Sequence, residues 1–274
     1  MAGEIITSSG LAAAVGVKLI YDVCGPTAKY AGGELASYAE IGVKNLKRVF
    51  ENAAKQLKAQ NKIGGQVPPR VLKEILSEGY FCEDELQAMY LGGVLASSKG
   101  SISRDDRAIA YCSLVNSLSS YQLRTHCIIY SALLRIKHYH LGKNLLPIED
   151  IVSRWIQKHG LTVIIRESDY QSAMEFSAEE HPSNIAQHSF VGLEKKGLSE
   201  RGIHVCHSRN PNNPKDGEVP FRYFYPTMLG VELFLWGQGV GDCGLEAYRS
   251  DLLQKIELPF NVEPYEVHPG QCGF

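Results

Sequence analysis

The chain has 274 residues, of which 44% are hydrophobic and 21% are charged, and its formal net charge is −2. These values are typical of a globular protein that is long enough to bury a sizeable core. The nearly balanced charge excludes a global electrostatic attraction to nucleic acid or to an anionic membrane, although local basic faces can still occur. The seven cysteines are scattered without a CxxC pair, so we expect reduced thiols in a cytoplasmic protein and no disulfide framework.

The N-terminal segment predicts a helix over residues 11–24 that is rich in alanine and glycine. It lacks the basic start and the cleavage site of a secretory signal. Lys18 and Asp22 interrupt its apolar run, and a bilayer span needs about 20 largely apolar residues, so no simple transmembrane helix is expected. Small residues allow close packing in a core or an oligomer interface; the alternative is an amphipathic segment that contacts a membrane after activation.

A nearly heptad stripe of apolar and small residues predicts the longest helix, over residues 35–57. The opposite face carries lysines that form a candidate basic face for a partner, namely Lys44, Lys47, Lys55 and Lys58. Glu40 and Glu51 dilute this charge, and ordinary solvation of a surface helix is the simpler interpretation.

Residues 67–98 predict two short amphipathic helices. Pro68 and Pro69 favour the start of the first helix, and the acidic run from Glu83 to Glu85 favours the start of the second. Small residues on the second helix, such as Gly93, allow another helix to approach closely. Three further helices are expected over residues 104–118, 121–139 and 147–159.

The composition changes after Gly160. The pattern predicts a strand over residues 161–167, helices over 168–180 and 182–197, a two-stranded wing (203–208 and 221–225) and a last helix over 228–236. This order is that of a winged-helix module. We therefore predict a mainly α fold, in which a helical N-terminal half precedes a small α+β winged-helix-like module with a two-stranded wing. The expected units are a helical domain (1–145), the module (146–240) and a tail (241–274) with a short helix.

Several patterns in the sequence contain residue types that can carry out chemistry. Five side chains have zinc-binding chemistry near the C-terminus: His204, Cys206, His207, Cys243 and Cys272. Strand alternation separates His207 from its neighbours, so no metal site is expected. His126 and Cys127 are adjacent on a helix and point about 100° apart, which disfavours a catalytic dyad. The glycine-dense residues 236–244 follow a helix, which predicts a flexible exit and not a phosphate loop. We expect no catalytic residue and no cofactor.

The winged-helix-like module carries six cations that would meet phosphates if it bound DNA: Lys195, Lys196, Arg201, Arg209, Lys215 and Arg222. Acidic residues are interleaved with them, and the second helix of the module has few side chains that could read bases. A protein interface is therefore favoured over nucleic acid, although contact with nucleic acid is kept as an alternative.

Three sequence blocks in a fixed order, over residues 25–35, 44–53 and 67–98, resemble the N-terminal helical region of the abortive infection alpha family of bacterial proteins. The resemblance covers the first half of the chain. A weaker match follows near the C-terminus, where Pro226 and Thr227 are transposed relative to the Thr-Pro-Leu-Gly helix start of the family, and Val231 replaces a basic residue.

The resemblance implies an antiphage, abortive-infection-type protein that acts through protein–protein interaction or as a non-enzymatic component of a defence system. This interpretation implies that the protein binds another protein or forms a homo-oligomer. Two alternatives stay open: a winged-helix DNA-binding regulator, and a membrane-active effector that uses the small-residue N-terminal helices.

Overall fold

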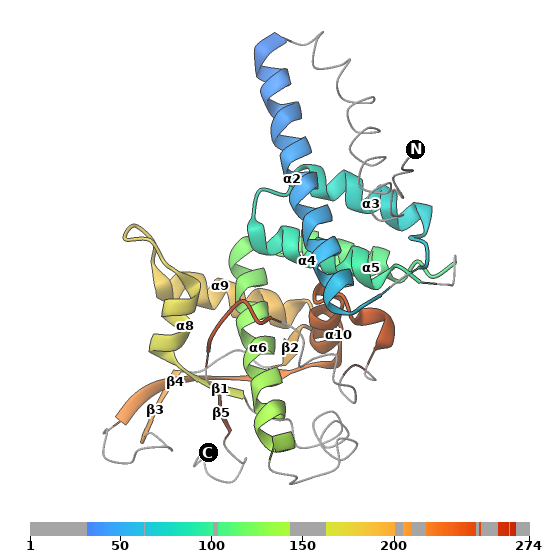
Figure 1. Cartoon of the computed structure of the whole chain (residues 1–274). Coiled ribbons are helices and arrows are strands. Elements are labelled where there is room, and N and C mark those ends of the chain that lie inside the picture. Colours follow the sequence, from blue (N-terminus) through green and yellow to red (C-terminus); the bar gives the residue numbers. More distant parts are fainter. Residues whose placement is uncertain are drawn as a thin grey trace, which may run out of the picture.

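The computed structural model describes residues 32–62, 64–100, 104–142, 163–200, 205–209, 218–244, 247, 257–262 and 264–266. Within these residues, eight α-helices form most of the molecule, and a small antiparallel sheet lies near the C-terminal part (Figure 1). The predicted mainly α fold, with strands confined to the second half, is confirmed.

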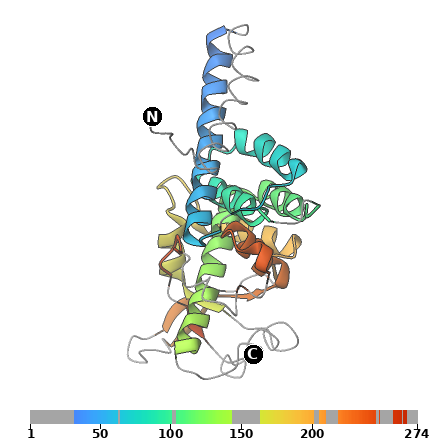
Figure 2. The same cartoon turned by 45° about the vertical axis from the view of Figure 1, so that its right-hand side comes forward.

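The long N-terminal helix α2 (Gly32–Ala59) buries the stripe that its sequence predicts, including Leu46, Val49 and Ala53. This stripe packs on α3 (Pro69–Tyr80) and α4 (Glu85–Ser97). The first turns of α2 project beyond α3 and α4 in both views of the molecule (Figures 1 and 2).

The two helices predicted within residues 67–98 are confirmed, and so is the acidic start of the second. Asp84 caps α4 by accepting a 2.8 Å hydrogen bond from the backbone N–H of Gln87. The first helix runs through Gly79, although a glycine often interrupts a helix. It continues to Tyr80 because Gly79 faces α2, where a β-carbon would lie 3.1 Å from Leu46 Cδ2. The glycine permits close helix packing instead of ending the helix.

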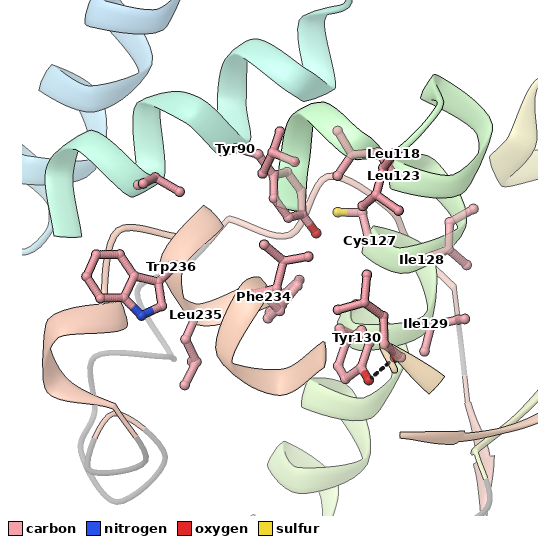
Figure 3. Close-up of a cluster of buried hydrophobic side chains, with 14 of the residues drawn as sticks. Tyr90, Leu118, Leu123, Cys127, Ile128, Ile129, Tyr130, Phe234, Leu235 and Trp236 are labelled. Carbon is pink, nitrogen blue, oxygen red and sulfur yellow. Dashed lines mark hydrogen bonds between the residues drawn. The ribbon is translucent and has the colours of Figure 1, made fainter. Parts of the chain in front are cut away.

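Helices α5 (Ala108–Ser117) and α6 (Ser120–Gly142) follow, and α6 runs through the middle of the molecule (Figure 1). The last long helix, α10 (Met228–Gly237), packs against both α4 and α6. Figure 3 shows where they meet: Tyr90 from α4, Tyr130 from α6 and Phe234 from α10 point into one buried cluster. The helical half and the last helix of the C-terminal part therefore share a core.

The sheet is organised around β4 (Glu218–Pro226), which pairs antiparallel with three strands. The three partners of β4 are β1 (Val163–Arg166), β2 (Ser199–Glu200) and β3 (Val205–Arg209). A further strand, β5 (Tyr265–Glu266), pairs with β1. Two helices, α8 (Glu167–Met174) and α9 (Pro182–Lys195), lie between β1 and β2. The order β3–β4–β1, with α8 and α9 before the wing, is the predicted winged-helix-like arrangement.

The predicted helix over 168–180 is wrong at its C-terminal end, because α8 stops at Met174. Glu175 adopts the left-handed conformation (φ 53°), which ends the helix. Arg124 of α6 fixes this end, since its Nε donates to the Ala173 carbonyl at 2.7 Å and its Nη2 lies 2.6 Å from Glu175 Oε2.

The division into units at 145/146 and 240/241 stays a prediction, since the first boundary lies outside the described residues. The helices predicted over 11–24 and 147–159 lie outside them as well, as does most of the one predicted over 245–256. Among the helices that are described, none has the length and apolar character needed to cross a membrane.

Candidate interaction surface

Helix α9 holds the position of the second helix of a winged-helix module, and its sequence is amphipathic. Its inner positions, Ala186, Phe190 and Leu193, are buried. Its outer positions recur every three or four residues and form a solvent-facing stripe, which we call the α9 outer face: Asn184, Gln187, Val191, Glu194 and Lys195. Val191 is one of the few large apolar side chains that are exposed among the described residues, with 37% of its area accessible.

Contacts with α6, and with Ser119 directly before it, hold α9 in place. His188 Nε2 lies 3.2 Å from Ser119 Oγ and 3.2 Å from Gln122 Nε2. Gly192 leaves room for the same glutamine, because a β-carbon there would lie 2.0 Å from Gln122 Nε2. His188 is thus engaged with α6, which leaves Asn184 and Gln187 as the side chains of α9 with base-reading chemistry on the outer face.

Arg222, predicted as a phosphate contact, is instead an internal group. The residue is 8% exposed, and its guanidinium forms a two-point ion pair with Glu167, with Nη2 2.6 Å from Oε1 and Nε on the other oxygen. The guanidinium also lies over the rings of Tyr170 and Phe190, at 5.0 and 5.7 Å from their centroids. The assignment to a DNA-contacting surface is wrong for this residue, because its charge is neutralised and covered.

The other five cationic residues of the module do not form a cluster in the part of the chain that the structure describes. Lys195 is exposed and Lys196 is half-buried at the C-terminal end of α9. Arg209 lies opposite Glu218 in the register of the wing strands. Arg201 and Lys215 lie outside the described residues. On the described part of the module, positive charge is therefore sparse and is accompanied by acidic residues.

The basic face of α2 is exposed, as predicted, at Lys44, Lys47, Lys55 and Lys58. Two of these lysines have acidic partners, because Lys47 Nζ lies 3.7 Å from Glu51 Oε1 and Lys55 Nζ lies 2.8 Å from Glu257 Oε2. The hydrogen bond from Lys55 lowers the pKa of the Glu257 carboxyl. Exposed pairs of this kind contribute little to stability. They do reduce the local positive potential, which favours plain solvation of this face.

A buried polar network joins α4, α6 and α10 at His126, and sequence reasoning missed it. The Tyr90 hydroxyl donates to His126 Nδ1 at 2.9 Å, and Nε2–H donates to the Gly230 carbonyl at 3.1 Å. A carbonyl only accepts, so the proton of the neutral ring is on Nε2. Burial lowers the pKa of His126 from 6.5 to about 3. The neighbouring Cys127 thiol is held protonated, since burial raises its pKa to about 12.

This network predicts an acid sensitivity of the fold. The folded-state pKa of His126 lies below its unfolded value, so the unfolded chain takes up the proton first. The stability that the neutral His126 contributes to the fold is fully present above pH 6.5. It is lost as the pH falls toward about 3, at roughly 1.4 kcal/mol per pH unit. In the His126→Gln variant, we expect a shallower decline in the free energy of unfolding, measured by urea titration between neutral pH and mild acid. The exposed His181→Gln variant is the control, and equal slopes in both variants would contradict the assignment.

The glycine-dense residues 236–244 are packed, so the predicted flexible exit is wrong. Ser97 Oγ donates to the Trp236 carbonyl at 3.1 Å and accepts from the Gly241 N–H at 3.0 Å. Lys62 Nζ lies 2.7 Å from Asp242 Oδ2, which ties the segment to the end of α2. The glycines permit this close contact with α4 and α2.

The described residues contain no group of three or more His, Cys, Asp or Glu side chains that could hold a metal ion. Cys82 and Cys112 are buried thiols, and burial raises the pKa of each to about 12. Cys243 is exposed, and its pKa is raised by desolvation and by Asp242. No protein-family model, no curated protein and no solved structure matches this chain.

Proposed function

We propose that this protein is a non-enzymatic component of an abortive-infection-type antiphage system and that it acts by binding another protein. The sequence blocks over residues 25–35, 44–53 and 67–98 support the defence context. The observation that carries the mode of action is the α9 outer face, where an exposed Val191 lies among amide side chains and one charge of each sign. An apolar centre with a polar rim is typical of protein interfaces.

Recognition of DNA through the same helix is the second candidate function. Of the features of the module, only its winged-helix-like shape favours this function. Arg222 is neutralised by Glu167, and Lys195 is preceded by Glu194. Phosphate contacts supply most of the affinity of DNA-binding proteins, and they require unpaired cations facing the duplex. The charge distribution therefore favours a protein partner.

We accordingly predict weak or undetectable binding to duplex DNA at physiological salt, measured by fluorescence anisotropy with a mixed-sequence duplex. Any residual affinity should fall when Lys195 and Arg209 are both changed to Ala, because each lost phosphate contact lowers the salt slope by about one unit. Arg222 is left intact in this test, since its loss would perturb folding. Sub-micromolar, salt-sensitive binding that disappears in the double variant would promote the DNA-binding regulator over the protein-binding component.

The membrane-active alternative depends on the small-residue segment at the N-terminus, most of which lies outside the described residues.

The proposed context is tested by phage challenge. A susceptible bacterial host carrying this gene with its neighbouring genes should show fewer plaques than a host carrying the neighbouring genes alone. The difference is measured as efficiency of plating across a broad phage panel. Unchanged plating for every phage, with the protein present at normal levels, would contradict the defence role.

A further inference from the structure

The two ends of the α9 outer face carry charges of opposite sign. Glu179 and Glu180 lie in the turn shortly before α9, which we call the acidic turn. Lys195 is the last residue of the helix and Lys196 follows it, and together they form the basic end. The middle of the stripe carries amide side chains and the exposed Val191. A surface with this order of charges is complementary to a second copy of itself that runs in the opposite direction.

Most of these charges are available to a second molecule. Within the part of the chain that the structure describes, Glu179, Lys195 and Lys196 take part in no ion pair. Glu179 and Lys195 are also exposed, and Lys196 is half-buried. Charges of this kind can form ion pairs with a partner without first breaking contacts within their own molecule.

The acidic turn and the helix are held in fixed positions. The Tyr121 hydroxyl of α6 donates to Glu180 Oε1, and the Ser177 N–H donates to Glu180 Oε2 at 2.6 Å. The contacts of His188 with α6 and with the residue before it hold α9 itself. A surface that is already ordered loses little conformational entropy when it binds.

We propose that the α9 outer face binds the α9 outer face of a second copy of this chain, with the two helices antiparallel about a twofold axis. This arrangement places the acidic turn of each copy beside the basic end of the other. It also covers Val191 with the amide-bearing middle of the other stripe and sets the two helix dipoles antiparallel. The inference rests on the proposed function, because it names a second copy as the partner of the same face.

The distribution of charge favours a second copy over a partner of one predominant charge. A uniformly acidic or basic partner would be repelled by one end of the face, whereas an antiparallel copy is attracted at both ends. The contact is small, because a helix of 14 residues is about 21 Å long. Glu194 also lowers the charge of the basic end. We therefore expect a weak dimer that forms only as the concentration rises.

Sedimentation velocity of the full-length protein, between about 1 μM and 1 mM, tests the proposal. We expect the average mass to rise from that of a monomer toward that of a dimer, and added salt to weaken the association. Val191→Asp or Lys195→Glu should raise the dissociation constant about tenfold or more, because each substitution occurs twice in a twofold interface. Glu179→Lys should also weaken the dimer, and its combination with Lys195→Glu in one chain should restore much of the affinity.

Lys44→Glu is the matched control, because it makes the same charge reversal at an exposed lysine of α2, and its dissociation constant should equal that of the wild type. Thermal unfolding verifies that all variants are folded. A wild type that stays monomeric at every concentration would overturn the proposal, and so would a dimer that Val191→Asp and Lys195→Glu leave unchanged.

Phage plating separates this inference from the proposed function. If the wild type is monomeric and Val191→Asp still abolishes the protection, the face binds a different protein, so the inference fails and the proposed function stands. If the dimer responds to the variants as predicted but plating is unchanged for every phage, the inference stands and the defence role fails.

Discussion

Changing Arg222 to Met is expected to lower the free energy of unfolding by about 3–5 kcal/mol, measured by urea titration. The reason is the position of its partner. The Glu167 side chain is 13% exposed, and Arg222 neutralises it through one hydrogen bond, from Nη2 to Oε1, and an ion-pair contact of Nε with the other oxygen. Removing the guanidinium leaves a carboxylate that is mostly buried and without its counter-ion, and also removes the cation above Tyr170 and Phe190.

Two further variants separate this effect from a general loss of charge. Lys47→Ala breaks the exposed Lys47–Glu51 pair, and we expect a change of at most about 0.5 kcal/mol. The double variant Arg222→Met with Glu167→Leu should recover part of the loss, because no unpaired buried charge remains. A small effect of Arg222→Met, similar to that of Lys47→Ala, would contradict the internal ion pair.

The Gly93→Ala variant is expected to lose about 3 kcal/mol, although alanine is the better helix former. Gly93 of α4 lies against the end of α10, where an added β-carbon would be 1.9 Å from the Gly237 carbonyl oxygen and 2.8 Å from that of Trp236. Both neighbours are backbone atoms, so the two helices would have to move apart. We expect a lower urea midpoint with an unchanged m-value.

Gly79→Ala is the control for this prediction, because it is the same change inside a neighbouring helix. A β-carbon at Gly79 would meet Leu46 Cδ2 at 3.1 Å, and this side chain can adjust. The gain in helix propensity, about 1 kcal/mol, then offsets the crowding, and we expect a change within about 1 kcal/mol. If both variants lost the same free energy, the close contact between α4 and α10 would not be the cause.

The sequence predicts those parts of the fold that depend on local pattern. The buried stripe of α2, the acidic start of α4 and the wing strands all follow from spacing, charge and turn residues, and the structure contains them. The end of α8 at Met174 could not be predicted, because Arg124 of another helix determines it. The packing of the glycine-dense stretch likewise depends on Ser97, which is remote in sequence.

The candidate surface was predictable to a similar degree. The exposed stripe of α9 follows from its amphipathic pattern, whereas the fate of individual charges does not. Arg222 meets Glu167 only because strands β1 and β4 pair in one register, with Ile165 opposite Arg222. Lys55 meets Glu257, which is 202 positions away in the chain. Likewise, His126 bonds partners on two other helices, which no local pattern indicates.

The central claim, that the protein acts by binding a partner through the α9 outer face, is tested most directly by phage plating with the Val191→Asp variant. Val191 is exposed, so the charge should leave folding intact, which thermal unfolding and the cellular protein level verify. We predict that Val191→Asp restores plating toward the level seen without this gene, whereas Lys44→Ala on the solvated face of α2 keeps the protection. Full protection by a folded Val191→Asp variant would contradict the claim.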